Sequence, residues 1–198
     1  YIGHIDEVGS LALTGVGVCM PLILLVSATA ALVSMGSAPL ASIKLGQKKQ
    51  AEAEAILGNS AMLLVILSLA LTAAILLFGR SLLPLLGASD NTFNYAWDYM
   101  WIYALGTLFV QLALGLNAFI TAQGFATTSM FTVLIGAGLN IILDPIVIFA
   151  LDMGVKGAAL ATILSQAVSA LWVVWFLTGK RPILRLKVAA LRLQPRVI

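Results

Sequence analysis

An aspartate inside a long apolar run is the residue best suited to do chemistry in this sequence. Asp144 lies in the stretch GLNIILDPIVIF, residues 138–149, directly before Pro145. An ionised carboxylate at the centre of a membrane helix costs about 2.5–3.5 kcal/mol on insertion scales. Such a group persists in an apolar segment when it is neutralised, paired or used. Burial favours the neutral, protonated form of a carboxyl, and the next basic residue along the chain is Lys156.

The neighbours of Asp144 along a helix extend its polar character. Asn140 lies one turn before Asp144 and Gly136 one turn before Asn140, so the three share one helical face. Pro145 has no amide hydrogen and clashes with the carbonyl of Ile141, which frees backbone acceptors beside the carboxylate. Carboxylate, amide and loosened helix form a site that can exchange a proton or hold a cation. Two structural interpretations stay open: a hydrated carboxylate near the outer interface, or a hydrogen bond across helices for packing alone.

The composition around this site identifies the class of protein. Hydrophobic residues make up 61% of the 198 residues and charged residues only 10%, whereas soluble domains carry roughly 25% charged residues. Apolar runs of about 20 residues cross a bilayer as helices, and these runs lack the alternation of a membrane barrel strand. We therefore predict an all-α polytopic membrane protein with five transmembrane helices, spanning approximately 8–35, 55–79, 97–122, 127–151 and 157–178.

Local signals divide and pack these helices. The turn-like residues 123–127, QGFAT, separate the third predicted helix from the fourth. Residues 1–179 then form the helical domain, and residues 180–198 form a basic amphipathic segment, predicted to be a helix on the membrane surface. The last transmembrane helix carries small residues four apart, a pattern that predicts close packing against neighbours. They form two rows: Gly154, Ala158 and Thr162, and Gly157, Ala161 and Ser165.

The distribution of basic residues predicts the orientation. All of the 11 lysines and arginines except Arg80 and Lys156 lie within residues 44–49 or 180–196. Four predicted spans separate these two segments, so both lie on the same side of the membrane. Lysine and arginine concentrate in cytoplasmic loops, which places the chain start outside and the chain end in the cytoplasm. The clusters therefore indicate a partner that is the lipid bilayer and not a nucleic acid.

The residue inventory argues against an enzyme. An intramembrane aspartyl protease needs two carboxylates that share a proton. Only Asp144 lies in the predicted membrane interior. The single histidine, His4, and the single cysteine, Cys19, leave metal and nucleophile–histidine schemes without their parts. Cys19 is predicted to be a packed, inert thiol. No glycine-rich phosphate loop is present, so we predict no metal site and no cofactor apart from a coupling ion.

Four stretches of the chain resemble the MATE family, the multidrug and toxin extrusion transporters. They are LGQKKQAEAEAILGN (45–59), LGASD (86–90), LNAFITAQG (116–124) and GAGLNIILDPIVIFALDMGVKGAALAT (136–162). The resemblance covers essentially the whole chain in order. It implies a fold of twelve helices in two six-helix lobes, of which this chain resembles helices two to six of the N-terminal lobe. The first helix and the C-terminal lobe would be further partners, and residues 180–198 the cytoplasmic linker between lobes.

The same resemblance implies a function and a site. Members of this family are secondary active multidrug efflux transporters of the plasma (inner) membrane, which export organic cations in exchange for protons or sodium ions. The branch with the LDP motif has a polar cavity, with Pro145 as a helix kink. Thr121 departs from the family pattern, since many relatives carry an arginine there. Mapped onto this sequence, the resemblance implies a cavity centred on Asp144, with the residues Tyr99, Asn117, Asn140, Asp144 and Thr162.

Two alternatives remain. A lipid-linked oligosaccharide flippase of the same wider superfamily would line its cavity with basic residues to hold pyrophosphate, and no predicted span here contains lysine or arginine. The chain begins with Tyr1, which we interpret as a sign of a fragment. A truncated lobe by itself cannot alternate access, so an inactive membrane subunit is the second alternative. The family's acidic residue in the first helix would precede Tyr1.

Overall fold

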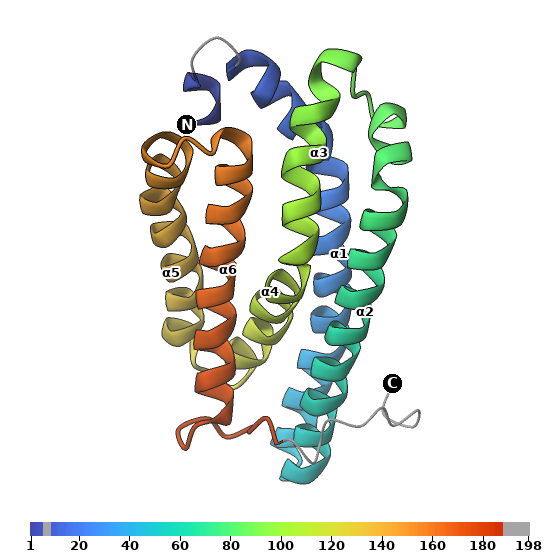
Figure 1. The fold of residues 1–198 in the computed structure, drawn as a ribbon. Helices are drawn as coiled ribbons and strands as arrows, with labels where there is room; N and C mark the ends of the chain where they lie inside the picture. Colours follow the sequence, from blue (N-terminus) through green and yellow to red (C-terminus); the bar gives the residue numbers. More distant parts are fainter. Residues whose placement is uncertain (6–8, 188–198) are drawn as a thin grey trace.

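The computed structural model describes residues 1–5 and 9–187, and its regular elements are all helices (Figure 1). A short 3₁₀ turn, η1 (Ile2–His4), precedes the bundle. The main helices are α1 (Gly9–Gly46), α2 (Gln50–Leu85), α3 (Asp90–Leu105), α4 (Thr107–Ala122), α5 (Ala126–Pro145) and α6 (Gly154–Thr178). A π-helical turn, η2 (Ile146–Ala150), continues α5.

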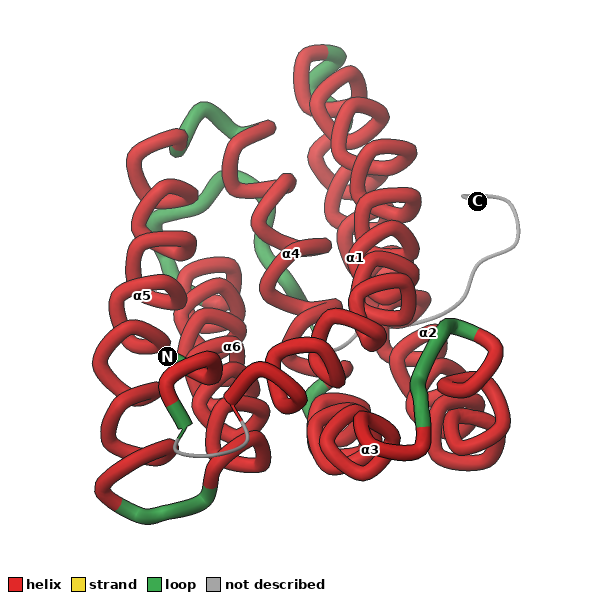
Figure 2. The backbone as a smooth tube through the Cα atoms, turned by 90° about the horizontal axis from the view of Figure 1, so that it is seen from above, coloured by secondary structure: helices red, strands yellow, loops and turns green. Residues whose placement is uncertain are grey.

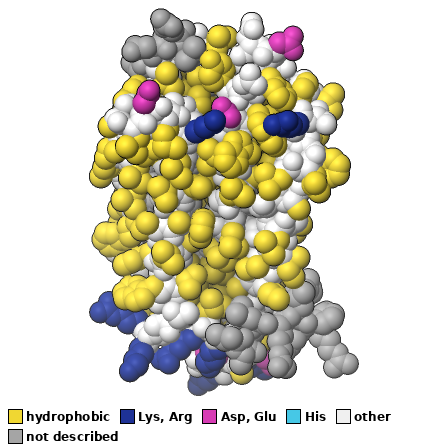
Figure 3. All heavy atoms as spheres, in the orientation of Figure 1, with side chains coloured by type: hydrophobic (Ala, Val, Ile, Leu, Met, Phe, Trp, Pro, Cys, Tyr) yellow, Lys and Arg dark blue, Asp and Glu magenta, His cyan; other side chains and the backbone are white. Residues whose placement is uncertain are grey.

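The helices are long and apolar enough to cross a membrane, which confirms the predicted all-α membrane fold. Four of the described helices qualify by length and hydropathy: α1, α2, α5 with η2, and α6. The bent pair α3 and α4 makes a fifth span when the two are counted as one. Side chains that point away from the bundle form a broad hydrophobic belt on the face seen in Figure 3.

Charged side chains gather at the two ends of this belt (Figure 3). We call one end the basic end, because the turn between α1 and α2 and the segment after α6 both lie there (Figure 1). Lys44 lies in the last turn of α1, where it pairs with Glu52 at 2.6 Å. The other end, called the opposite end, carries the Asp98–Lys156 pair at 3.5 Å. The predicted positions of the two basic segments on one side of the bundle agree with this arrangement.

The third predicted helix, 97–122, is two helices and not one, which corrects the sequence prediction. The α3 helix already begins at Asp90, where Ser89 and Thr92 form a reciprocal capping box. The chain then bends by 57° between α3 and α4, at Gly106. A Cβ atom on Gly106 would lie 2.1 Å from Cγ2 of Ile163 on α6. Glycine therefore permits the close approach of α6 at the bend.

Two hydrophobic clusters hold the bundle, one in each half. The first joins the beginning of α1, the end of α2 and most of α3, and it includes η2 and the start of α6. The second joins the end of α1, the beginning of α2, α4 and the end of α6. Cys19 belongs to the first cluster, is 0% exposed and donates from Sγ to the carbonyl of Ala96 at 3.2 Å. The predicted packed thiol is thereby confirmed.

The predicted close packing of α6 is confirmed. In the most apolar 18-residue stretch of α6, 39% of the residues are buried. The corresponding share for α5 with η2 is 17%. Gly157 sits directly against the backbone of η2, because a Cβ there would lie 2.7 Å from the carbonyl oxygen of Val147. Figure 2 shows the view along the bundle, in which α6 lies beside α5 and between α5 and α3.

The segment that follows α6 is not the predicted surface helix over its described part. Residues 180–187 have no helical hydrogen bonding and run along the basic end toward α2 (Figure 1). Their backbone groups bond to other elements instead, as shown by Leu186 N donating to the carbonyl of Leu177 at 2.9 Å. The remainder of the predicted amphipathic segment, 188–198, lies outside the described residues.

Candidate functional site: a polar pocket between three helices

A pocket of about 230 Å³ lies between α4, α5 and α6. It contains the predicted residues Asn117, Asn140 and Thr162, one from each helix. Its walls are otherwise small apolar residues and neutral polar ones, and none of its lining residues carries a charge. The polar lining residues are Asn117, Thr132, Asn140, Thr162, Ser165, Gln166 and Ser169. Neutral donors and acceptors of this kind can orient a ligand without fixing its charge.

Asn117 brings an unsatisfied acceptor to the pocket. Its Nδ2 donates to the backbone carbonyl of Ser129 on α5 at 3.3 Å, which ties α4 to α5. Its Oδ1 is buried and accepts no hydrogen bond from any described residue. A buried amide oxygen without a donor is unfavourable.

Asn140 and Asp144 form the polar pair predicted on α5. Asn140 Nδ2 donates to Asp144 Oδ1 at 3.1 Å, and both side chains are partly buried. The α-helical pattern ends at Pro145, one residue beyond Asp144, and the chain continues as the π turn η2. Pro145 cannot donate to the preceding turn, and π turns often occur at functional positions. The local loosening that the sequence predicted beside the carboxylate is therefore present as a π turn.

Tyr99 and Thr162 complete the predicted set from α3 and α6. The Tyr99 hydroxyl is close enough to Thr162 for a side-chain hydrogen bond. Thr162 Oγ1 also donates to the carbonyl of Ala158 at 2.9 Å. Tyr99 is 7% exposed and stacks on Tyr103 with ring centroids 6.0 Å apart. The stack holds the phenol against α6.

The five predicted residues form one connected group, but they do not share one wall. Three line the pocket, while Asp144 reaches it through Asn140, and Tyr99 reaches it through Thr162. The pocket is therefore centred on neutral residues, with the carboxylate at its edge. This differs from the expectation of a cavity centred on Asp144.

Sequence reasoning missed four polar residues of the pocket: Thr132, Ser165, Gln166 and Ser169. The three on α6 follow Thr162 at three, four and seven residues, which places them all on one helical face. Ser165 was assigned to helix packing alone, although its spacing matched this polar stripe. On α5, Thr132 precedes Asn140 by eight residues and lies on the same face. Ser169 Oγ donates to the carbonyl of Thr132 at 3.1 Å and so links the two stripes.

The chemistry available here is proton exchange and weak cation binding. Across residues 1–5 and 9–187, no three His, Cys, Asp or Glu side chains come together as metal ligands would. One carboxylate beside one amide can take up or release a proton, and it can attract a cation into the adjacent neutral pocket.

Comparison with known proteins places the chain in a family. The MatE family model matches residues 1–146. Multidrug export protein MepA of Staphylococcus haemolyticus (strain JCSC1435) is 32% identical over 188 residues, which is 95% of this chain and 41% of that protein. This chain thus spans about two fifths of the length of such relatives.

Solved structures give the same result. An inward-facing multidrug resistance MATE family transporter of the MOP superfamily aligns over 94% of this chain and 43% of its own, with 26% identity and a TM-score of 0.89. An outward-facing structure described in the same terms aligns over 99% of this chain and 43% of its own, again with 26% identity and a TM-score of 0.89. By family match, sequence identity and fold, the chain belongs to the MatE family of transporters.

Proposed function

We propose that this chain is the N-terminal lobe of a multidrug exporter that moves organic cations out of the cell in exchange for protons or sodium ions. The observation that carries the proposal is the Asn140–Asp144 pair, 3.1 Å apart at the π turn beside Pro145 and at the edge of the neutral pocket. Helices interrupted near the middle of a transporter are where coupling ions and substrates commonly bind.

The charge of the site favours a cationic substrate. The pocket lining contains neither lysine nor arginine, and the nearest ionisable partner of Asn140 is a carboxylate. A flippase that holds pyrophosphate would need basic groups in this position, because phosphate oxygens are recognised by charged donors. The flippase alternative is therefore not favoured.

Protonation of Asp144 would couple export of the organic cation to entry of the proton. Ionised Asp144 accepts the hydrogen bond from Asn140 and attracts a cation, which the hydroxyl and amide groups of the pocket then orient. A proton arriving on the free carboxylate oxygen removes the charge and turns that oxygen into a donor. The cation loses its electrostatic attraction and is released. A sodium ion would compete for the same oxygens in a sodium-coupled exporter.

Alternating access would come from movement of the whole lobe against a second one. The described lobe aligns equally well with inward-facing and outward-facing relatives, which supports a lobe that rocks as a rigid body. The protonation state of Asp144 then acts by changing which orientation is more stable, and Pro145 with η2 is the element that would adjust. We propose that the basic end faces the cytoplasm of the plasma (inner) membrane, because lysine and arginine gather there (Figure 3).

The test is dye transport by the complete gene product in inverted membrane vesicles. Wild type should accumulate a fluorescent cationic dye under an imposed proton gradient or sodium gradient. Asp144→Asn should abolish gradient-driven uptake at unchanged protein level, because the variant keeps the size of the side chain and loses its titration. Asp152→Asn is the matched control: Asp152 is exposed eight residues later, and asparagine tolerates its positive φ of 50°.

Three results would contradict the proposal. They are uptake that ignores both gradients, uptake by Asp144→Asn at the wild-type rate, and equal loss in the Asp152→Asn control. The alternative of an inactive truncated lobe is tested in parallel with vesicles that contain only the 198-residue chain. Since one lobe cannot alternate access, these vesicles should show no gradient-driven uptake.

A further inference from the structure

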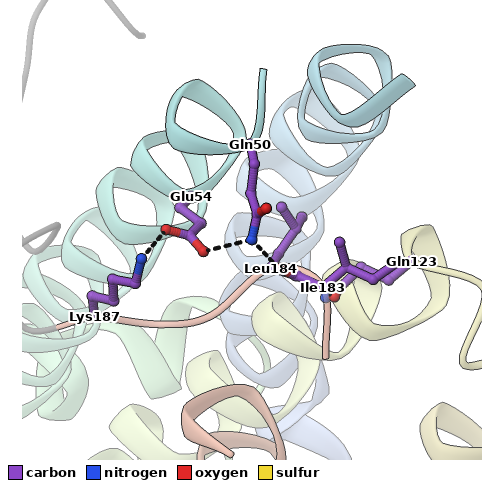
Figure 4. Close-up of polar contacts among 6 residues, drawn as sticks. All are labelled: Gln50, Glu54, Gln123, Ile183, Leu184 and Lys187. Carbon is purple, nitrogen blue, oxygen red and sulfur yellow. Dashed lines mark hydrogen bonds and ion pairs between the residues drawn. The ribbon is translucent and has the colours of Figure 1, made fainter. Parts of the chain in front are cut away.

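The segment after α6 is bound tightly to the basic end of the bundle. We call residues 183–187 the strap. It crosses from α6 to the N-terminal turns of α2 (Figures 1 and 4). Leu184 N donates to Gln123 Oε1 at 2.7 Å, at the end of α4, and Leu186 N donates to the carbonyl of Leu177 at 2.9 Å. Two helices thereby receive backbone hydrogen bonds from the strap.

A buried acid on α2 holds the far end of the strap. The side chain of Glu54 is 7% exposed, and Lys187 Nζ pairs with its Oε2 at 2.6 Å. Gln50 Nε2 donates to Glu54 Oε1 at 3.2 Å and to the carbonyl of Ile183 at 2.8 Å. Figure 4 shows this chain of contacts, in which one amide bridges the acid and the strap backbone. A carboxylate this buried is strongly unfavourable when its partner is removed.

An apolar contact adds to these polar ones. Leu184 is 0% exposed and belongs to the hydrophobic cluster formed by α1, α2, α4 and α6 at the basic end. Leu186 packs against the same cluster. The strap is therefore part of the core of the lobe and not a loose surface connection.

We propose that the strap is a positioning device, with Glu54 as its anchor, that makes the start of the connection to the second lobe a rigid part of the first. This inference rests on the proposed two-lobe transporter. The docked strap delivers the chain from beneath α2, although α6 ends on the other side of the bundle (Figure 1). The docked part of the connection extends at least to Lys187. The length of the part that stays free governs how closely movement of one lobe is tied to the other, because a longer free linker lowers the effective concentration of its ends.

Limited trypsin digestion of the detergent-purified complete protein tests the docking directly. The readout is the rate of cleavage after Arg185, which lies in the strap and is exposed. Glu54→Gln and Lys187→Ala each remove the ion pair and should speed this cleavage about tenfold, because loss of a charged hydrogen bond raises the population of the undocked strap. Lys187 is largely exposed, with 58% of its side chain accessible, so its replacement removes little packing, and Glu54→Gln removes the same ion pair without leaving a buried charge.

Glu52→Gln is the matched control on the same helix. Glu52 pairs with Lys44 and Lys49 and has no bond to the strap; its variant should be cleaved at the wild-type rate. An unchanged elution volume in size-exclusion chromatography reports that each variant is folded. Cleavage after Arg185 at the wild-type rate in both Glu54→Gln and Lys187→Ala would overturn the proposal, as would equal acceleration in Glu52→Gln.

Dye transport by the same variants tests the role in lobe coupling. We expect Glu54→Gln and Lys187→Ala to lose roughly half or more of the maximal rate of dye transport, because conformational steps set the maximal rate of many such cycles. An unchanged maximal rate with accelerated cleavage would show a strap without a role in transport and would refute the coupling. Failure of the proposed function is seen separately, in Asp144→Asn, whose strap should stay protected from trypsin.

Discussion

The contact between Gly106 and Ile163 gives the sharpest stability prediction. Gly106 has φ −86° and ψ −4°, a conformation that alanine adopts without strain. Any cost of Gly106→Ala is therefore steric. The added Cβ would lie 2.1 Å from Cγ2 and 2.5 Å from Cβ of Ile163. The second of these atoms is attached directly to the α6 backbone, so rotation of the side chain cannot move it away.

The expected magnitude follows from this geometry. Overpacking in a tightly packed core costs about 1–3 kcal/mol, and the upper part of that range applies because α6 itself must move. For a domain of this size each kcal/mol lowers the unfolding temperature by about 2–4 °C. Gly106→Ala should therefore unfold roughly 4–12 °C below wild type.

Cys19 supplies the assay. It is the only cysteine of this chain, it is 0% exposed, and it lies between α1 and α3, the helix that leads into the bend. A fluorogenic maleimide reacts with it only after unfolding, so a temperature scan of the detergent-purified chain reports the stability of the helices that form the bend. Gly138→Ala is the matched control, because a Cβ at Gly138 meets no atom within 4 Å, and this variant should unfold at or slightly above the wild-type temperature.

A second substitution tests the cause. Ile163→Ala removes the contact at 2.1 Å and leaves the one at 2.5 Å, so it should partly relieve Gly106→Ala. The double variant should be more stable than the sum of the two single effects predicts. Gly106→Ala that unfolds within 1 °C of wild type, or a strictly additive double variant, would show that Ile163 does not set the bend.

Three further predictions use the same thermal assay. Gln111→Ala should lower the unfolding temperature by several degrees, because Gln111 is 0% exposed and donates to the carbonyl of Val26 at 3.0 Å and to Thr29 at 2.6 Å; an unchanged temperature would contradict this. Glu52→Gln should shift it by no more than about 1 °C, because half of the Glu52 side chain is exposed and such pairs contribute little; a larger loss would mean that the pair is structural. Pro145→Ala should raise it, because alanine restores the missing amide, and should slow dye uptake by the complete protein; faster uptake would refute a role for the loosened turn.

Composition and periodicity were sufficient for the membrane class, the turn at 123–127 and the tight packing of α6. These properties depend on local apolar content and on small residues at fixed spacing, and neither needs knowledge of a neighbour. Asn140 and Asp144 were predictable as a pair for the same reason, since residues four apart meet on one helix. The loosened helix at Pro145 was predictable in the same way, because proline lacks a backbone amide hydrogen whatever its neighbours are.

The remaining features depend on contacts between segments far apart in the chain. A side chain at the Gly106 bend is excluded because Ile163 on another helix occupies the space of a Cβ. Over residues 183–187 the strap replaces the predicted surface helix. Gln50 and Gln123 form hydrogen bonds with strap backbone groups, and Glu54 pairs with Lys187. A surface helix would not make these contacts.

The polar site also combines features that the sequence predicts with features that depend on contacts between helices. The sequence by itself determined a membrane lobe with a polar stripe around Asp144, because helical periodicity places those residues on one face. Only the tertiary structure decided that the pocket is centred on neutral residues of three helices, with the carboxylate at its edge. The physical reason is that a pocket is the space left between packed helices, and its position depends on their mutual distances and not on the pattern of any one of them.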